Sequence, residues 1–333
     1  MESHKLQLRE LLCNLQVGHY RSSYTASLAS SVVDYPVEYG RRYHAFRPGC
    51  NHLTFCKAYP MPNDEAEMDR LDMAHALMVK TIGNRLYLTP AEKGKVHKIL
   101  DIGTGTGIWA VEMGDIFPDA QVFGNDLSSI QPSWIPPNVK FEVDDVESEW
   151  LNDRKYDFIL CRYMLASIGD WPKLVKNIYD NLAPGGWAEF QDMSAEWYSD
   201  DGTLTEKHVT RQWNKTLADC MEAMGRDGRP GPKLEGWVRD AGFQEMFHQK
   251  YKVPIGPWAK EQRLKEIGLL NLAQVLDGLE AFTMRAFCGF LGKSMEEVLE
   301  TISEVRKELK ALHLFHAQFD IHVVYGRKPA DSG

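Results

Sequence analysis

The sequence predicts an α/β fold built on a mostly parallel sheet, because two patterns alternate beyond residue 96. Short apolar runs of strand length are separated by stretches in which apolar residues follow helical spacing. Strands joined by crossovers and single helices are typical of right-handed parallel sheets. The 333 residues, of which 44% are hydrophobic and 26% charged, also have the composition of a globular chain.

The apolar runs expected to form strands are residues 97–102, 121–126, 139–143, 156–162, 187–191, 244–253 and 315–327. Helices are expected at about 64–79, 107–116, 172–182, 205–224, 233–241 and 258–312. Within the last region, Ser294 and Glu297 form a capping box that begins an amphipathic helix. The region is too helical for a bare loop, so we expect it to lie over a site.

Composition and charge exclude several classes of protein. The 38 Lys and Arg residues against 47 Asp and Glu give a formal net charge of −9, which opposes direct binding to nucleic acid. No run approaches the roughly 18 apolar residues of a membrane helix, and residues 1–16 are too polar for a signal peptide. The scattered cysteines favour a reduced, cytoplasmic protein, with the nucleus as the alternative. No metal site is expected, because Cys50, His52 and Cys56 lack a second ligand pair at finger spacing.

The most informative segment is a strand, a glycine turn and the start of a helix over residues 99–109. Gly103, Gly105 and Gly107 alternate with other residues, and the first of them lies two positions after Asp101. Glycine lets a turn tighten and lets a ligand lie against bare backbone. The helix that follows offers unpaired N–H groups at its first turn. The segment therefore predicts a ligand site, with an ordinary strand-to-helix turn as the alternative.

Two cofactors compete for that loop. Gly105, Gly107 and Ala110 match the dinucleotide fingerprint, and Asp126 lies about where the ribose-binding acid of an NAD site belongs. Asp101 favours the other cofactor, because a carboxylate beside the loop repels a pyrophosphate and attracts an ammonium or a sulfonium. S-adenosylmethionine carries both of these cations. We therefore expect S-adenosylmethionine, with NAD as the alternative.

Acidic residues also follow the next two predicted strands. Asp126 ends the second strand, where a carboxylate can accept both ribose hydroxyls. Asp144 and Asp145 follow the third strand, and one of them can accept from the adenine amino group, with Val146 beside it. Open α/β sheets bind ligands at the carboxyl ends of their strands. We expect these acids to surround one pocket.

These motifs resemble those of the seven-stranded class I methyltransferases. Over about residues 38–328 the chain is similar to the fungal LaeA-like methyltransferases, a family named after a regulator of secondary metabolism. The matching segments are residues 38–44, 64–72, 103–109, 126–132, 135–138, 145–150, Arg162, 170–171, 184–187 and 200–204. The glycine motif is specific to the superfamily, whereas residues 131–138 and 147–150 are more specific to the family.

The resemblance implies a cofactor pocket and a division of the chain into three parts. The residues it places around S-adenosylmethionine are Tyr43, Asp101, Gly103, Gly105, Gly107, Asp126, Asp145 and Val146. Residues 1–95 are expected to form a helical N-terminal cap and residues 96–192 the Rossmann-like core. Residues 193–333 complete the domain, with 258–312 as a helical insertion over the active site. Aromatic side chains of the cap and the insertion are expected to wall an acceptor pocket, with a homodimer interface as the alternative.

Methyl transfer from a sulfonium needs alignment and exclusion of water more than a catalytic triad. The acceptor is expected near residues 161–164, after the fourth strand. Arg162 is a candidate to hold an anionic substrate group, with a structural ion pair as the alternative. Asp192 and Glu189, near the end of the fifth strand, are candidates for a general base.

Three functions are consistent with these expectations. The first is an enzyme that methylates a small molecule in fungal secondary metabolism. The second is a LaeA-type nuclear regulator that acts with velvet-type protein partners. The third is a fold that binds S-adenosylmethionine without transferase activity. A membrane partner and direct contact with nucleic acid are not expected in any of them.

Overall fold

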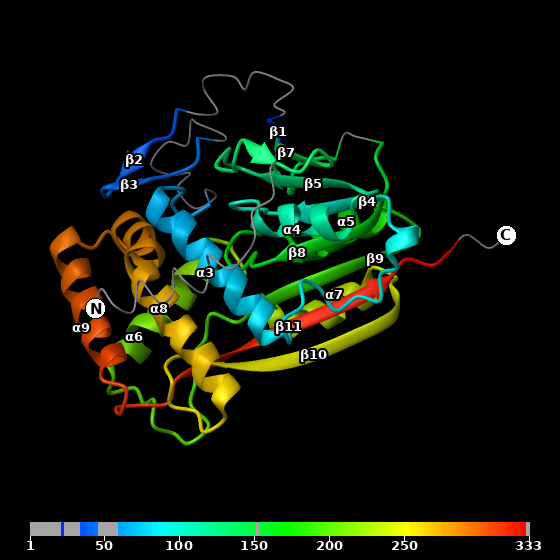
Figure 1. Ribbon diagram of the computed structural model, residues 1–333. Helices are drawn as coiled ribbons and strands as arrows, with labels where there is room; N and C mark the ends of the chain where they lie inside the picture. Colours follow the sequence, from blue (N-terminus) through cyan, green and yellow to red (C-terminus); the bar gives the residue numbers. More distant parts are fainter. Residues whose placement is uncertain (1–20, 23–33, 46–58, 151–152, 331–333) are drawn as a thin grey trace.

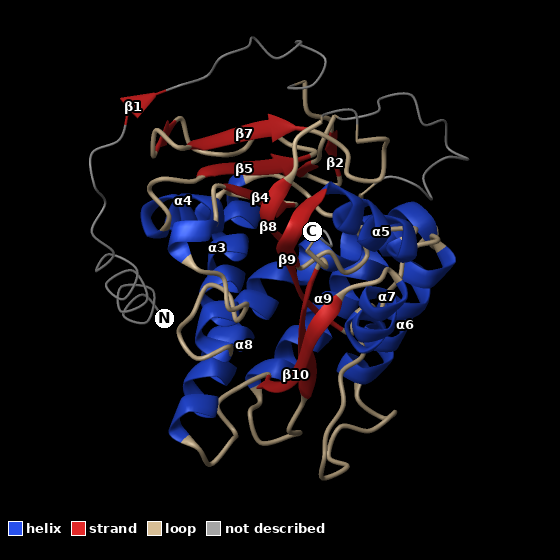
Figure 2. Ribbon diagram, turned by 90° about the vertical axis from the view of Figure 1, so that its right-hand side faces the viewer, coloured by secondary structure: helices blue, strands red, loops and turns tan. Residues whose placement is uncertain are grey.

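The computed structural model describes residues 21–22, 34–45, 59–150 and 153–330. A seven-stranded sheet runs through the molecule, with helices on both of its faces (Figures 1 and 2). The strands are β4 Lys98–Ile102, β5 Gln121–Asp126, β7 Val139–Val143, β8 Tyr156–Arg162, β9 Leu182–Met193, β10 Gln244–Pro254 and β11 Gln318–Arg327. Their order across the sheet is β10-β11-β9-β8-β4-β5-β7. The expected α/β fold is confirmed.

Strand direction changes at one end of the sheet. The strands from β7 to β9 run parallel, whereas β11 is antiparallel to β9 and β10 is antiparallel to β11. In the central strands, side chains on both faces are buried, among them Ile99, Leu100, Ile159 and Leu160. Continuous apolar runs are typical of parallel strands that helices cover on both sides. These continuous apolar runs made the central strands predictable from the sequence.

The crossover helices cover opposite faces of the sheet. Helix α4 (Ile108–Ile116) lies on one face and α5 (Trp171–Asn181) on the other (Figure 2). The α4 side also carries α3 (Glu65–Thr81) and α8 (Gln262–Met284). The α5 side carries α6 (Val209–Ala223), the 3-10 turn η3 (Gly231–Lys233) and α7 (Leu234–Asp240). None of the helices in the described part of the chain combines the length and the apolar character that crossing a bilayer requires.

The expected insertion forms the helical end of the molecule. It consists of α8, the six-residue π-helix η4 (Arg285–Phe290) and α9 (Met295–Lys310). The predicted capping box of Ser294 and Glu297 begins α9. Helices α6, α8 and α9 gather beyond the end of the sheet (Figure 1), where Trp213, Leu279 and Val305 belong to one buried cluster. Core packing therefore accounts for Val298, Ile302, Val305 and Leu309 of α9, whereas Met295 and Leu299 are exposed.

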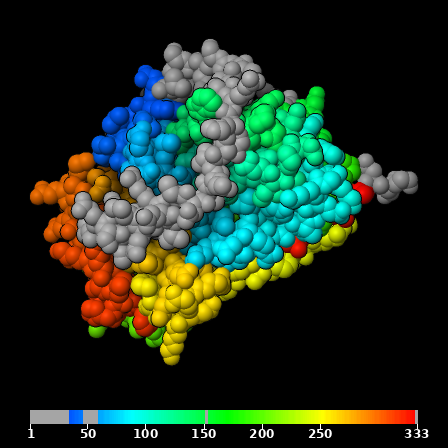
Figure 3. Space-filling model, viewed as in Figure 1, coloured from blue at the N-terminus to red at the C-terminus, as the bar shows by residue number. Residues whose placement is uncertain are grey.

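The N-terminal part is less helical than expected in its described residues. Helix α3 is confirmed, and Asp64 caps it by accepting from the N–H of Glu67. The other elements are the short strands β1 (Arg21–Ser22), β2 (Val37–Glu38) and β3 (Arg41–Arg42) and the 3-10 turn η2 (Lys93–Lys95). Strand β1 pairs with β6 (Trp134–Ile135), outside the main sheet. In Figure 3 the blue surface around β2 and β3 lies next to the orange surface of the C-terminal helices.

Strand β9 begins at Leu182, earlier than the expected residue 187. The Pro-Gly-Gly stretch before Trp187 belongs to this strand, and its backbone bonds to Lys328, directly after β11. Lys328 N–H donates to the Gly186 carbonyl, and Gly185 N–H donates to the Lys328 carbonyl. A Cβ at Gly186 would lie 2.9–3.2 Å from three carbonyl oxygens. The glycine therefore permits close approach of backbones within a strand.

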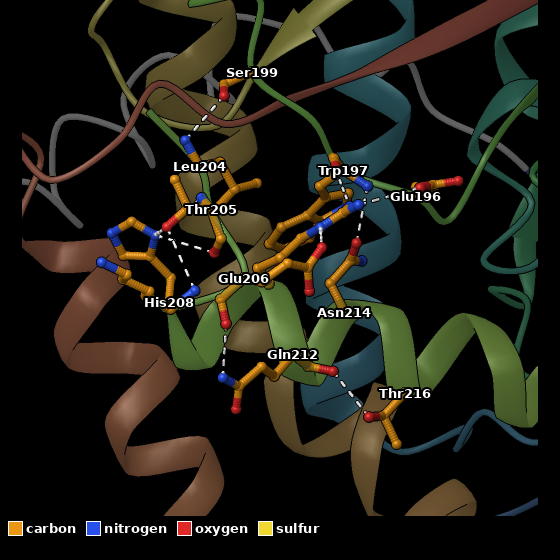
Figure 4. A network of polar contacts seen from close by, with 12 residues as sticks. Glu196, Trp197, Ser199, Leu204, Thr205, Glu206, His208, Gln212, Asn214 and Thr216 are labelled. Carbon is orange, nitrogen blue, oxygen red and sulfur yellow. Dashed lines mark hydrogen bonds and ion pairs between the residues drawn. The ribbon is translucent and has the colours of Figure 1, made fainter. Parts of the chain in front are cut away.

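Polar contacts also fix the connection between β9 and α6 (Figure 4). The Asn214 side chain accepts from the Trp197 N–H at 2.8 Å and donates to the Ala195 carbonyl at 2.7 Å. Farther along the loop, the Leu204 N–H donates to the Ser199 hydroxyl at 2.9 Å. These bonds satisfy backbone groups of an irregular segment that would otherwise be costly to bury. The network holds α6 against the end of the sheet.

A buried carboxylate attaches the segment before β4 to the middle of the sheet. Glu189 of β9 is fully buried and accepts from the Leu88 N–H at 2.8 Å and from the Thr89 N–H at 2.7 Å. The Thr89 hydroxyl and the Gln191 amide donate to it as well. Burial raises the pKa of Glu189, and these hydrogen bonds act in the opposite direction. Its bonds give Glu189 a structural role.

We expect Glu189→Ala to lower the free energy of unfolding by about 2–5 kcal/mol, because it leaves two backbone N–H groups and a hydroxyl buried without an acceptor. Urea unfolding followed by circular dichroism measures this loss. Glu300→Ala, on the exposed face of α9, is the matched control and should change stability by less than about 0.5 kcal/mol. Equal effects in the two variants would contradict the structural role of Glu189.

Candidate functional site

A cavity of about 660 Å³ lies at the carboxyl ends of β4, β5, β7 and β8. Its floor comes from the glycine loop and from the residues that follow β5 and β7. Residues of the N-terminal part and of η4 close it from the other side. The cavity therefore lies where a ligand of an open α/β sheet is expected to bind.

The glycine loop reaches the cavity with Gly103 and Gly105, whose φ angles of +65° and +56° favour glycine. Gly107, with a φ of +80°, precedes α4 and does not belong to the cavity wall. A Cβ at Gly107 would collide with the ring of Phe141. The structure thus places two of the three glycines at the cavity, while the third allows the helix to pack close to β7.

Asp101 lies behind the loop and not in the cavity wall. It is 3% exposed, and its carboxylate accepts from the Thr104 hydroxyl at 2.6 Å. Burial raises its pKa to about 6, and the nearby Arg162 guanidinium acts in the opposite direction. Asp101 was expected to line the cofactor pocket, but its carboxylate does not reach the cavity wall. Asp101 fixes the loop and adds negative charge beneath it.

Asp126 is held at the cavity by the loops that it joins. Its two carboxylate oxygens accept from the N–H groups of Gly105 and Ser128, each at 2.9 Å. Burial raises its pKa to about 6, while these backbone bonds favour the ionised form. Each carboxylate oxygen can accept a further hydrogen bond. Asp126 therefore presents a fixed acceptor to the cavity, as expected.

The end of β7 contributes the other acidic wall. Asp144, Asp145 and Val146 all line the cavity. Asp145 accepts from the N–H of Glu147 at 2.9 Å, which closes a local turn. The side chain of Val146 is 8% exposed and lies in the same buried cluster as Phe123. The structure brings these expected residues together with Asp126.

The N-terminal part contacts the glycine loop, the segment after β5 and the end of β8, through side chains that were not among the expected site residues. Asp72 of α3 accepts from the Thr106 hydroxyl at 2.7 Å in the glycine loop. Asn63 donates to the Ser128 hydroxyl at 3.1 Å, beyond β5. His75 of α3 lines the cavity itself. The match of residues 64–72 to the family indicated that this segment matters. The local sequence does not show which residues its side chains contact.

Tyr43 is fully buried and lies outside the cavity wall, contrary to the expectation drawn from the resemblance. The Arg285 guanidinium lies 4.1 Å from the centre of the Tyr43 ring. Burial raises the pKa of the Tyr43 hydroxyl to about 12. Its neighbours His44 and Ala45 line the cavity instead. Tyr43 therefore contacts Arg285 through its ring and does not itself line the cavity.

The insertion reaches the cavity through Arg285 on the π-helix. Its guanidinium pairs with both carboxylate oxygens of Glu38 in β2, at 3.1 and 3.2 Å, and donates to the Tyr59 carbonyl. The aromatic side chains expected from the insertion do not line the cavity, and the tyrosines in its wall are Tyr59 and Tyr163 among the described residues. Phe282, Met284, Phe287 and Phe290 pack in the helical core, and Trp258 stacks on His316. Tyr20, Tyr24, Phe46 and Phe55, and the Cys50–His52–Cys56 group, lie outside the described residues.

The two candidate catalytic residues lie in different environments. Arg162 lines the cavity at the end of β8. Asp192 is 1% exposed, lies outside the cavity wall, and accepts from the N–H groups of Met164 and Met193 at 2.7 and 2.8 Å. Tyr163 and Ala166, in the turn that Asp192 holds, have positive φ angles of 54° and 59°. The structure therefore places Asp192 outside the cavity wall, where its carboxylate holds the turn after β8.

The chain is similar in sequence to known methyltransferases. A family model described as a methyltransferase domain matches residues 73–246. "Methyltransferase pytC" of Aspergillus terreus is 46% identical over 306 residues, which cover 91% of each chain. "Secondary metabolism regulator LAE1" of Cochliobolus heterostrophus is 34% identical and covers 88% of this chain and 94% of its own. A solved structure of phosphoethanolamine N-methyltransferase 2 from Haemonchus contortus, in complex with S-adenosyl-L-methionine, is 18% identical with a TM-score of 0.45. That match covers 85% of this chain and 58% of the solved one.

We expect Asp192→Asn to change how stability depends on pH. Burial raises the pKa of Asp192 to about 7 from 3.8, so the folded protein binds more protons than the unfolded chain between these values. The wild type therefore loses stability across this window as the pH rises, and the variant lacks that loss. The stability deficit of the variant should be largest near pH 5 and shrink towards about pH 7.5. Urea unfolding across this range measures it.

Asp240→Asn, at the exposed end of α7, is the matched control for this titration. Its stability difference from the wild type should stay constant across the same pH range. A constant deficit for Asp192→Asn as well would show that Asp192 does not titrate in this window.

Proposed function

This chain belongs to the methyltransferase-domain family and is an S-adenosylmethionine-dependent methyltransferase, and we propose that it methylates a small molecule in fungal secondary metabolism. The observation that carries the proposal is the cavity, whose 660 Å³ fall within the range of small-molecule sites. The N-terminal part and Arg285 contribute to its wall, so the cavity is lined on more than one side. The similarity to a fungal methyltransferase over 91% of the chain supports the same assignment.

The cavity residues fit the cofactor of this family. Asp126 offers fixed carboxylate oxygens to two ribose hydroxyls, and Asp145 with Val146 suits the adenine ring. Gly103 and Gly105 present bare backbone to the remaining part of the molecule. When bound, the cofactor supplies a methyl group that is already activated on a positively charged sulfur. We propose Asp126, Asp145, Val146, Gly103 and Gly105 as the residues that hold it.

The chain has to align the acceptor and exclude water. Leu71, Ile130, Met164 and Ile168 provide apolar parts of the cavity wall. An apolar wall excludes water, so that the acceptor is the nucleophile that faces the methyl group. Alignment of the reactants alone can lower the activation free energy by about 7–11 kcal/mol in favourable cases. We propose that the reaction at this site depends on positioning.

A regulatory role is the second candidate. It is supported by the 34% identity to a protein named as a regulator of secondary metabolism. In this role the chain would act through protein partners of the velvet type, because its net charge of −9 opposes direct contact with DNA. The two roles differ in the acceptor, which is a small molecule in the first and a protein in the second.

We expect Asp126→Ala to weaken the binding of S-adenosylhomocysteine by about 2–4 kcal/mol, because it removes two hydrogen bonds to ribose. Isothermal titration calorimetry measures this effect, and circular dichroism checks that the variant is folded. Asp119→Ala, in the exposed loop before β5, is the matched control and should bind like the wild type. NADH should bind neither protein. An unchanged affinity in Asp126→Ala would contradict the placement of the ribose.

The proposed acceptor class is tested with methyl-labelled S-adenosylmethionine and a small-molecule extract of a fungus that carries the gene. We expect mass spectrometry to find a labelled metabolite with the wild type and a much smaller amount with Asp126→Ala. A parallel reaction contains nuclear proteins in place of the extract. Label found in protein alone would favour the regulatory role over the proposed one.

A further inference from the structure

Arg162 differs from the other arginines of the cavity wall. Arg226 pairs with Glu147 at 2.6 Å, and Arg285 pairs with Glu38 at 3.1 Å. Within the described part of the chain, no carboxylate forms an ion pair with Arg162. Asp101 attracts it electrostatically, but that carboxylate is directed to the Thr104 hydroxyl. The charge of Arg162 therefore remains available to a ligand.

Hydrogen bonds hold one side of this guanidinium. Its Nη2 lies 3.1 Å from Nδ1 of His75, and Nε2 of the same ring lies 3.0 Å from Oε2 of Glu112. An arginine nitrogen can only donate, so Nδ1 of His75 accepts and its Nε2–H donates to Glu112. On the other side, Nη1 is buried and has no hydrogen-bond acceptor among the described residues.

The imidazole orients the guanidinium without neutralising it. Burial lowers the pKa of His75, and the positive charge of Arg162 acts in the same direction, so the ring is neutral. Glu112 of α4 acts on Arg162 through this ring, which comes from α3. A cation that is removed from water and left without a counterion costs free energy. An anionic ligand group in the cavity would supply both the countercharge and an acceptor.

We propose that Arg162 binds a carboxylate of a ligand in this cavity, and that His75, held by Glu112, positions its guanidinium. The planar guanidinium matches the two oxygens of a carboxylate in a two-point hydrogen-bonded pair. The inference rests on the proposed function, because two molecules can bring a carboxylate to the cavity. One is the methionine part of the cofactor, and the other is an acidic acceptor.

The first experiment tests the cofactor as the source. S-adenosylhomocysteine carries the carboxylate, whereas 5′-methylthioadenosine keeps the nucleoside and lacks the amino acid. Calorimetry compares both ligands on the full-length wild type, Arg162→Gln and Arg162→Lys. A cofactor carboxylate predicts that Arg162→Gln binds S-adenosylhomocysteine about 10- to 100-fold more weakly and methylthioadenosine within about twofold of the wild type. Arg239→Gln, on the exposed side of α7, is the matched control and should change neither affinity.

The second experiment tests the acceptor as the source. The protein saturated with S-adenosylhomocysteine is titrated with benzoate and with benzamide, which has the same shape and no charge. An acceptor carboxylate predicts that benzoate binds the wild type and fails to bind Arg162→Gln, while benzamide does not distinguish them. If Arg162→Gln changes neither the affinity for S-adenosylhomocysteine nor the binding of benzoate, the proposal is overturned.

The positioning role of His75 needs a separate pair of variants. His75→Leu removes the acceptor of the Arg162 bond, whereas His75→Asn can place an amide oxygen near the position of Nδ1. We expect His75→Leu to reproduce part of the Arg162→Gln loss for the carboxylate ligand, and His75→Asn to recover most of it. Equal losses for the ligands with and without a carboxylate would reduce His75 to a structural residue. If neither Arg162→Gln nor the His75 variants change binding while Asp126→Ala still weakens cofactor binding, the proposed function stands and the role of Arg162 falls.

Discussion

Buried carboxylates bonded to backbone N–H groups hold the cavity edge of the sheet together. Asp126 joins the glycine loop to the turn after β5, and Asp192 fixes the turn after β8. Glu189 fastens the segment before β4 in the same way. Loops at the end of a parallel sheet expose N–H groups that no neighbouring strand satisfies, and an ionised carboxylate is a strong acceptor for them. The shape of the cavity depends on these bonds, because its floor consists of the loops that they hold.

The raised pKa values near the cavity have one physical origin. Burial raises the pKa of Asp101 and Asp126 to about 6 and that of Asp192 to about 7. Each of these groups is kept in place by hydrogen bonds that favour its ionised form. Perturbed pKa values often mark catalytic groups, but structural networks also produce them. Of these three acids, only Asp126 lines the cavity, so only its titration acts directly on a ligand.

The cavity is a joint product of the sheet and the segments that precede and follow it. Helix α3 brings Asp72 to the glycine loop and His75 to Arg162. The π-helix brings Arg285 to Glu38 of β2. A π-helix is rare and often occurs at functional sites, where it displaces a side chain from the regular helical position. These contacts couple α3 and the π-helix to the segments that form the cavity, so the cavity cannot be assigned to the sheet alone.

The sequence by itself determined where most strands lie along the chain and which residues stand at their ends. The runs 121–126, 139–143 and 156–162 match β5, β7 and β8, because strand length and apolar pattern are local properties. The glycine loop and Asp126 followed from spacing alone. Only the tertiary structure decided that Asp101, Asp192 and Tyr43 lie outside the cavity wall, and that His75 and Arg285 belong to it. It also decided that Asp72 holds the glycine loop through Thr106. The direction in which a side chain points depends on segments that are distant in the sequence, and a pattern of local spacing does not contain that information.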